Sequence, residues 1–254
     1  MKIVRFSHNH HEQLGVLEGE EIRPLQGALD QLVPVPGAKP TPLKAARLLA
    51  PVVPGKIVAI GLNYRDHAAE RGNKVPTEPL IFLKPSTCVI GPGDAIIYPP
   101  QTSNLHYEGE LAVVIAKRAR NVSRAQARSY VLGYTCLNDV TARDLQDHDV
   151  QFTRGKSFDT FAPIGPMIVT SIDPSDLAIE TRLNGEVRQH SRTSNLVFDC
   201  DYLISYVSQV MTLMPGDVIT TGTPGGIGPM QVGDTVEVEI EGIGCLRNTI
   251  AAPA

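Results

Sequence analysis

The stretch LHYEGELAVVI, residues 105–115, decides the fold prediction because it places two carboxylates within a largely apolar run. Successive side chains of a β-strand point to opposite faces, so Glu108 and Glu110 share one face while apolar side chains occupy the other. Two like charges held together on a buried strand are unfavourable unless a cation, a shared proton or basic partners compensate them. A hard divalent cation is the simplest compensation. A half-exposed strand with solvated glutamates is the alternative.

A third carboxylate follows a second strand-like run, residues 130–138. We expect Asp139 to stand at the N-terminus of a helical turn that carries Arg143 and Gln146 on the same face. An isolated aspartate in this position is typical of a helix N-cap. The guanidinium and the amide beside it, however, are groups that bind carboxylates and carbonyls, so they suit a site for a metal-bound oxo acid.

Residues 63–70, NYRDHAAE, predict a helix of about two turns, with Asn63 as the N-cap and Gly72 just beyond its end. His67 and Glu70 are three residues apart and therefore share a face, where a carboxylate can orient an imidazole and raise its basicity. This pattern fits a general-base pair. A solvated pair on a surface helix is the alternative.

Composition narrows the class of protein. With 254 residues, of which 42% are hydrophobic and 20% charged, the chain suits one large domain or one domain with a small appendage. A net charge of −4 favours neither nucleic acid nor an anionic membrane as a partner. No apolar run approaches the roughly 20 residues that span a bilayer, and the N-terminus does not resemble a signal peptide, so we expect a cytoplasmic protein.

Strand signals dominate the organisation of the chain. Short strands expected at 2–6, 14–17 and 21–24 define a small N-terminal cap, residues 1–53, and the segment PVVP at 51–54 precedes a catalytic domain, residues 54–254. Gly-Asp pairs at 93–94, 216–217 and 233–234 predict turns that lead into strands. Helical periodicity is limited to a short turn near 124–130 and a helix near 201–213. The prediction is a mixed α+β, β-rich fold.

Six ordered blocks together resemble the fumarylacetoacetate hydrolase family. They are NYRDHAAE (63–70), FLKP (82–85), HYEGEL (106–111), NDVTARDLQ (138–146), GKSFD (155–159) and GTPGGIG (222–228). The similarity extends from about residue 55 to 250, and the first 50 residues resemble the cap of compact bacterial members. The resemblance implies a β-roll catalytic domain with a small N-terminal β cap, and a protein that, like most members of the family, forms a homodimer.

The resemblance also implies roles for particular residues. Glu108, Glu110 and Asp139 match the ligands of a divalent cation, Mg²⁺ or Mn²⁺, with Ca²⁺ as a substitute in crystals. His67 and Glu70 match a basic dyad in a mobile lid, and Lys156 matches a catalytic cation. The positions that match substrate contacts are Tyr64, Arg143, Gln146 and Thr223. Large animal-type members have a further aspartate ligand ahead of the lid, where this chain has Ile60, Gly61 and Leu62.

The implied activity is conversion of small-molecule 2-oxo or 2-hydroxydienoic acids through an enolate that the cation stabilises. The favoured reaction is that of a 2-hydroxyhepta-2,4-diene-1,7-dioate isomerase / 5-oxopent-3-ene-1,2,5-tricarboxylate decarboxylase in aromatic-compound catabolism. Alternatives are hydrolysis of acylpyruvates of the fumarylpyruvate type, decarboxylation of oxaloacetate, or a non-catalytic metal and oxo-acid binding protein. A non-catalytic binding protein would need no His67–Glu70 dyad. Arg65, Arg71 and Lys74 are candidate partners for a second substrate carboxylate, or ordinary exposed cations.

Overall fold

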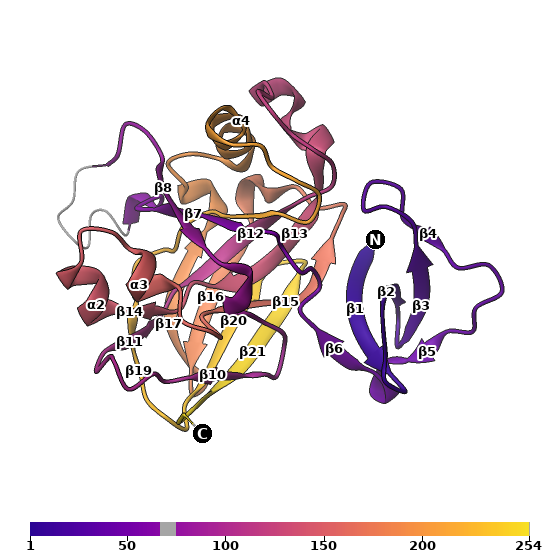
Figure 1. Ribbon diagram of the computed structural model, residues 1–254, viewed down its shortest axis with the longest axis horizontal. Coiled ribbons are helices and arrows are strands. Elements are labelled where there is room, and N and C mark those ends of the chain that lie inside the picture. The colour runs from indigo at the N-terminus through magenta and orange to yellow at the C-terminus, as the bar shows by residue number, and fades with distance from the viewer. Residues whose placement is uncertain (67–74, 254) are drawn as a thin grey trace.

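The computed structural model describes residues 1–66 and 75–253 and is rich in strands (Figure 1). The longest sheet has the order β4 (Val33–Pro34), β3 (Glu21–Gln26), β2 (His11–Glu18), β1 (Lys2–His8), β15 (Ala162–Val169), β13 (Val131–Asn138), β12 (Gly109–Ile115), β18 (Val218–Thr220), β7 (Ile57–Gly61) and β8 (Leu80–Lys84). Off this path, β5 (Thr41–Pro42) pairs with β3, β6 (Arg47–Leu49) with β1, and β9 (Val89–Ile90) with β15.

Two smaller sheets and a few short helices complete the described part of the chain. The first sheet runs β10 (Ala95–Ile97), β21 (Gly244–Ala251), β20 (Thr235–Ile240), β16 (Ala178–Leu183) and β17 (Glu186–Arg192), and the second runs β14 (Thr141–Ala142), β11 (Leu105–Tyr107) and β19 (Gly228–Met230). The α-helices are α2 (Arg143–His148), α3 (Thr153–Lys156) and α4 (Cys200–Val210). The 3₁₀ turns are η1 (Leu43–Ala45), η2 (Ser86–Cys88), η3 (Arg124–Tyr130), η4 (Pro174–Asp176) and η5 (Thr193–Asn195). The predicted β-rich α+β fold is confirmed.

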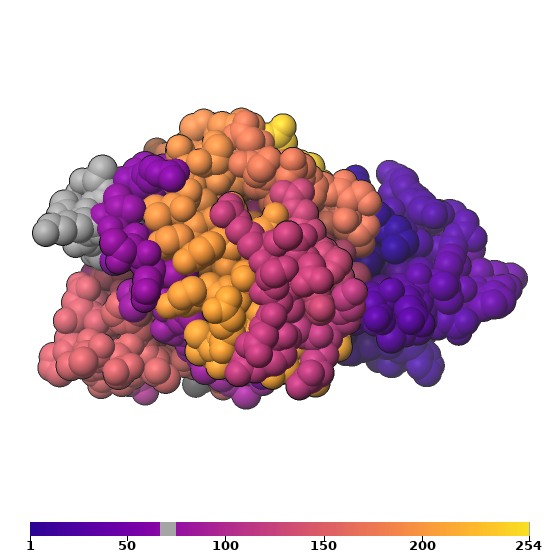
Figure 2. All heavy atoms as spheres, turned by 90° about the horizontal axis from the view of Figure 1, so that it is seen from above, coloured from indigo at the N-terminus to yellow at the C-terminus, as the bar shows by residue number. Residues whose placement is uncertain are grey.

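The N-terminal strands form a lobe beside the rest of the molecule (Figures 1 and 2). The expected strands at 2–6, 14–17 and 21–24 are present as β1, β2 and β3. Asn9 and His10 turn the chain between β1 and β2 with φ of 49° and 64°, the left-handed pair that a two-residue hairpin requires. β1 also pairs with β15 through Lys2↔Val169 and Ile3↔Ile168, so the lobe extends the main sheet.

The strand β12 lies between β13 and β18 and is buried along its whole length. Leu111, Val113 and Ile115 pack into one hydrophobic cluster, whereas Ala112 and Val114 pack into the other. A strand covered on both faces is expected to read as a continuous apolar run, as this one does. The two clusters therefore fix the register of the strand that carries Glu110.

The three Gly-Asp turns share one local mechanism. Gly93, Gly216 and Gly233 adopt φ of 79°, 86° and 96°, a region that favours glycine. Each following aspartate accepts a hydrogen bond from the backbone N–H three residues before it, at 2.7–2.8 Å. The turns lead into β10, β18 and β20, as predicted.

One local prediction was wrong, and a second was correct except for the end of its helix. Asp139 does not begin a helix, because the chain first forms β14, which pairs with β11, and α2 starts only at Arg143 with Ala142 as its N-cap. The helix expected near 201–213 ends at Val210, because the backbone of Leu213 instead exchanges hydrogen bonds with Ala119. Tertiary pairing overrides the local pattern at both positions. No helix in the described ranges is long and apolar enough to cross a membrane.

Gly109 is a position where the fold leaves no room for a side chain. A Cβ atom there would lie 2.1 Å from Thr181 Oγ1 and 3.2 Å from Val238 Cγ1. We expect Gly109→Ala to lower the free energy of unfolding by about 1–3 kcal/mol, the usual cost of overpacking. Chemical denaturation of Gly109→Ala and of Gly109→Ala/Thr181→Ala measures this. The double variant should recover part of the loss, and equal stability of the single variant and the parent would contradict the packing argument.

Candidate active site

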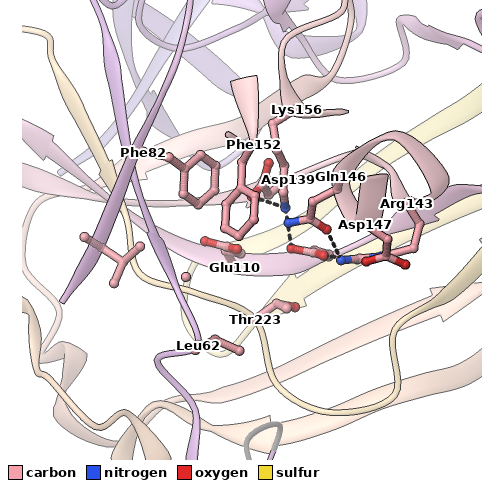
Figure 3. Close-up of a pocket in the computed structure, with 13 residues that line it drawn as sticks. Leu62, Phe82, Glu110, Asp139, Arg143, Gln146, Asp147, Phe152, Lys156 and Thr223 are labelled. Carbon is pink, nitrogen blue, oxygen red and sulfur yellow. Dashed lines mark hydrogen bonds and ion pairs between the residues drawn. The ribbon is translucent and has the colours of Figure 1, made fainter. Parts of the chain in front are cut away.

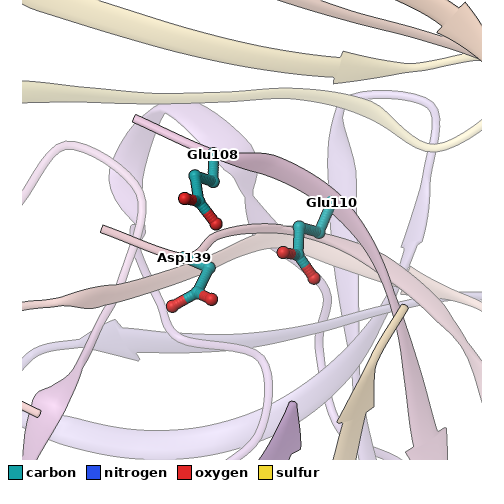
Figure 4. Close-up of side chains that lie close together, drawn as sticks. All are labelled: Glu108, Glu110 and Asp139. Atoms are coloured by element: carbon teal, nitrogen blue, oxygen red, sulfur yellow. The ribbon is translucent and has the colours of Figure 1, made fainter. Parts of the chain in front are cut away.

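A cavity of about 200 Å³ opens where β12, β13, α2, α3 and the segment after β18 meet (Figure 3). Glu108, Glu110 and Asp139 form part of its wall. Each offers an oxygen within 4.8 Å of the others, so the predicted convergence of the three carboxylates is confirmed (Figure 4). All three are buried, with exposed fractions of 6%, 2% and 1%. Carboxylates gathered in this way need compensation.

Backbone hydrogen bonds set the spacing of these carboxylates. Gly109 on β12 lies opposite Asn138 on β13, which brings the residues on either side of the pair together. The Asp139 N–H donates to the Glu108 carbonyl at 2.8 Å, and the Asn138 side-chain oxygen accepts from the Glu108 N–H at 2.9 Å. The position of each carboxylate is therefore fixed by the strand pair, before any ligand is bound.

Three buried cations surround Glu108 and Asp139. Lys156 Nζ donates to Glu108 Oε2 at 2.8 Å and to Asp139 Oδ2 at 2.7 Å. Arg143 forms an ion pair with the other oxygen of Glu108. Lys84, whose side chain is fully buried, donates to Asp139 Oδ1 at 2.6 Å and to the Lys156 carbonyl at 2.5 Å. Every oxygen of these two carboxylates thus has a cationic partner.

The ion pairs determine the charge states of Glu108 and Lys156. Burial alone raises the pKa of Glu108, but the Lys156 ammonium and the Arg143 guanidinium outweigh it and hold the pKa well below its usual range. Burial alone lowers the pKa of Lys156, but the charges of Asp139 and Glu108 outweigh it and raise the pKa. Glu108 is therefore ionised and Lys156 protonated at neutral pH.

Glu110 differs from Glu108 and Asp139, because no cationic side chain among the described residues contacts it. Burial raises its pKa well above the ordinary value, and the negative charges of Asp139 and Glu108 raise it further. The Thr220 hydroxyl and the Gly222 N–H, the latter at 2.8 Å, both donate to Glu110 Oε2. These bonds orient the side chain and leave Oε1 available to a ligand.

The donor set fits a hard divalent cation. Oxygen-only ligands suit Mg²⁺ and Mn²⁺, and each carboxylate oxygen has lone pairs beyond the one that Lys156, Lys84 or Arg143 uses. The raised pKa of Glu110 provides a second indication, because a bound cation would stabilise the ionised form that burial disfavours.

Other predicted site residues are distributed differently. Arg143, Gln146, Lys156 and Thr223 line the cavity, and Arg143 donates to the Gln146 carbonyl oxygen. Tyr64 instead lies fully buried in the hydrophobic cluster around Leu111 and does not line the cavity, so its role as a substrate contact stays a prediction. His67 and Glu70 lie outside the described residues.

The sequence analysis assigned no role to two buried residues that support the site. Lys84 ends an apolar strand, LIFLK, and a lysine at such a position is the available signal for an internal ion pair. Gln189 accepts a hydrogen bond from the Gly109 N–H at 2.9 Å and donates to Thr223 Oγ1 at 2.8 Å. It lies on strand β17, where only Ser191 is buried as well, and nothing in the sequence distinguishes it from a surface glutamine.

Comparison with known proteins identifies the family of this chain. Residues 56–251 match the family described as fumarylacetoacetate (FAA) hydrolase, C-terminal. The chain belongs to the fumarylacetoacetate hydrolase family. Residues 1–51 match the family described as Rv2993c-like, N-terminal. The protein Rv2993c of Mycobacterium tuberculosis is 45% identical over 98% of both chains.

Relatives within the fumarylacetoacetate hydrolase family have several named activities. The mitochondrial oxaloacetate tautomerase Fahd2a of Rattus norvegicus is 42% identical over 82% of this chain and 71% of its own. The structure of 2-hydroxyhepta-2,4-diene-1,7-dioate isomerase from Mycobacterium marinum is 42% identical, with a TM-score of 0.93 over 100% of this chain and 99% of its own. Maleylpyruvate hydrolase from Sphingobium sp. SYK-6, in complex with manganese(II) and pyruvate, is 32% identical, with a TM-score of 0.82 over 100% of both chains. The chain is an enzyme of this family.

The carboxylate cluster makes a prediction about cation binding. Mg²⁺ or Mn²⁺ should raise the melting temperature of the parent protein, because a ligand that binds only the folded state stabilises it. Glu110→Gln keeps an acceptor for the Thr220 and Gly222 bonds but removes the charge, so most of that rise should disappear. Glu186→Gln, on an exposed strand position, is the matched control and should keep the metal-dependent rise in melting temperature. An unchanged metal-dependent shift in Glu110→Gln would rule out the three-carboxylate site.

The raised pKa of Glu110 predicts a pH dependence. Without metal, the folded state keeps a proton that the unfolded state releases, so stability should fall as the pH rises from the ordinary glutamate pKa toward the raised one. A bound cation needs the ionised form, so the stabilisation by Mg²⁺ should grow over the same range. Melting temperatures between about pH 5 and 8, with and without Mg²⁺, measure both trends. Glu110→Gln should lack this part of the pH dependence of stability. If the stabilisation of the parent by Mg²⁺ does not change with pH, the inference that Glu110 is protonated in the metal-free protein is wrong.

Proposed function

We propose that this enzyme binds a divalent cation, Mg²⁺ or Mn²⁺, through Glu108, Glu110 and Asp139 and converts 2-oxo carboxylic acids or their 2-hydroxydienoic tautomers through an enolate. The observation that carries the proposal is the convergence of three buried carboxylates beside protonated Lys156 in a cavity of small-ligand size. The bound cation would supply Lewis acidity at the C1 carboxylate and C2 oxygen of the substrate.

The protein's own side chains contribute positioning and charge. The Lys156 ammonium is shared between Glu108 and Asp139, and it also lies where it can offer a hydrogen bond to an oxygen that gains negative charge. The side chain of Gln146, with its oxygen occupied by Arg143, presents its amide N–H groups to the cavity as donors for a substrate carboxylate. These groups are preorganised by buried contacts, so little reorganisation accompanies the reaction.

Proton transfer is assigned to His67 and Glu70 on the sequence pattern alone. An imidazole oriented by a carboxylate can accept the proton of the 2-hydroxyl group of a 2-hydroxy-2,4-dienoic acid and deliver a proton to C5, which gives the 2-oxo-3-enoic isomer. It can instead remove a proton from a water, which leads to hydrolysis. The identity of 42% with the Mycobacterium marinum isomerase supports isomerisation of the 2-hydroxydienoate type, as the sequence analysis favours. The likeness to the pyruvate-bound maleylpyruvate hydrolase supports acylpyruvate hydrolysis as the second candidate.

A panel assay tests the proposal. The metal-loaded enzyme is incubated in parallel with acetylpyruvate, oxaloacetate and 2-hydroxyhepta-2,4-diene-1,7-dioate, and the products are followed by absorbance and chromatography. We expect turnover of at least one substrate and its loss in Glu110→Gln. Lack of turnover, together with no binding of oxalate or pyruvate in the presence of Mg²⁺, would refute the proposed function.

The dyad has its own prediction. His67→Ala should keep metal and oxalate affinity, because chelation needs only the carboxylates and the cation, yet should lower acylpyruvate hydrolysis by about 10² to 10⁴, the usual contribution of a general base. Residual decarboxylation of oxaloacetate should exceed residual hydrolysis, because it needs no activated water. Hydrolysis at the parent rate would place the base elsewhere. Loss of metal binding would make His67 a ligand.

A further inference from the structure

Gln189 is a buried side chain to which the proposed reaction assigns no role. It lies on β17, and its exposed fraction is 0%. Its Oε1 accepts a hydrogen bond from the Gly109 N–H at 2.9 Å. Its Nε2 donates to Thr223 Oγ1 and to the Pro224 carbonyl, both at 2.8 Å. The amide therefore uses its oxygen and both of its N–H bonds to join two segments that are far apart in the chain.

These two segments are the parts of the site that hold the carboxylates and one side of the cavity. Gly109 lies between Glu108 and Glu110, and Thr223 lines the cavity (Figure 3). The Thr223 hydroxyl donates back to the Gly109 carbonyl at 2.9 Å. Gln189, Thr223 and Gly109 thus form a closed ring of hydrogen bonds. Each bond in such a ring orients the next, so the loss of one member frees the others.

The ring determines the direction of the Thr223 hydroxyl. A backbone N–H can only donate, so the Gly109 N–H requires the oxygen of the Gln189 amide to face it and the NH₂ group to face Thr223. The Thr223 oxygen accepts from that group, and the hydroxyl hydrogen therefore points away from Gln189, to the Gly109 carbonyl. A ligand oxygen in the cavity can receive this hydrogen while Gln189 keeps the Thr223 oxygen in place.

The backbone around Gln189 fixes its position. Gln189 lies opposite Thr181 on β16, in a strand pair that continues on both sides of it. Gly226 packs against β17 so closely that a Cβ atom there would lie 2.1 Å from the Arg188 carbonyl oxygen. β17 is therefore a fixed point to which both the strand of Glu110 and the segment that follows β18 are bonded.

We propose that Gln189 is a positioning residue, which holds the Thr223 hydroxyl where it donates to an oxygen of a cation-bound 2-oxo acid. The inference rests on the proposed function and deepens it, because it assigns how this side of the cavity recognises the ligand. Gln189 itself does not line the cavity. Its effect on the ligand is therefore transmitted through Thr223 and disappears when the hydroxyl is absent.

A double-mutant cycle tests this transmission. Calorimetry measures oxalate affinity at saturating Mg²⁺ for the parent, Gln189→Met, Thr223→Val and the double variant. Each single variant should weaken oxalate binding by about fivefold, the usual effect of one lost hydrogen bond. In the Thr223→Val background, Gln189→Met should have an effect at least about threefold smaller, because residues that act through one contact are not additive. Gln26→Met, on an exposed strand position of the N-terminal lobe, is the matched control and should bind oxalate like the parent.

Mg²⁺ binding separates positioning from a general loss of structure. The rise in melting temperature with Mg²⁺ should be the same in Gln189→Met as in the parent, because the carboxylates are unchanged, whereas a disordered site would lose cation and oxalate binding together. Gln189→Glu keeps an acceptor for the Gly109 N–H and replaces Gln189→Met in the cycle if that variant does not fold. Its added charge acts equally in both backgrounds, so the expected non-additivity is the same.

Three results would overturn the inference and leave the proposed function intact. The first is an equal effect of the Gln189 substitution with and without the Thr223 hydroxyl. The second is an unchanged oxalate affinity in Thr223→Val, and the third is a joint loss of Mg²⁺ and oxalate binding in a folded Gln189 variant. A parent protein that binds neither oxalate nor pyruvate with Mg²⁺ would refute the proposed function, and the inference with it.

Discussion

Neutralisation of buried carboxylates by buried cations is the interaction on which this molecule depends. Glu108 and Asp139 are kept ionised in the interior because Lys156 bridges them, Arg143 holds the one and Lys84 holds the other. Removing any one of these partners would leave each carboxylate with at least one cation, but would deprive at least one buried carboxylate oxygen of its hydrogen-bond donor, which costs free energy. Glu110 has no such partner among the described residues, so burial and the neighbouring carboxylates raise its pKa. A bound cation would stabilise its ionised form.

The sheet makes this arrangement possible by fixing atoms that would otherwise repel one another. β12 is paired on both sides and covered on both faces, and Gly109 between the two glutamates lies so close to Thr181 that no side chain fits. Gln189 connects the same glycine to Thr223, whose hydroxyl also donates to the Gly109 carbonyl at 2.9 Å. A buried, paired strand holds its side chains in place more accurately than a loop does, because the register of the strand cannot shift without exposing apolar side chains.

The side chains that line the cavity come from different parts of the fold. Glu110 belongs to β12, Glu108 immediately precedes that strand, and Asp139 immediately follows β13. Lys156 is the buried last residue of the short helix α3. Phe82, Phe152 and Asp147, which also line the cavity, come from the edge strand β8, the segment before α3 and the end of α2. The relatives of this chain carry isomerase, hydrolase and tautomerase names, so members of the family differ in reaction.

The sequence pattern by itself indicated the β-rich fold and the pairing of Glu108 with Glu110, because alternation along a strand is a local constraint. The grouping of Asp139, Arg143 and Lys156 with them followed from the resemblance to a known family, because these contacts join residues far apart in the chain. Only the tertiary structure showed that Asp139 precedes a strand and not a helix, that Lys84 holds it, and that Tyr64 packs in the core. These outcomes depend on the pairing of β11 with β14 and on contacts between residues more than 50 positions apart, such as Lys84 and Asp139. A local sequence pattern does not encode such contacts.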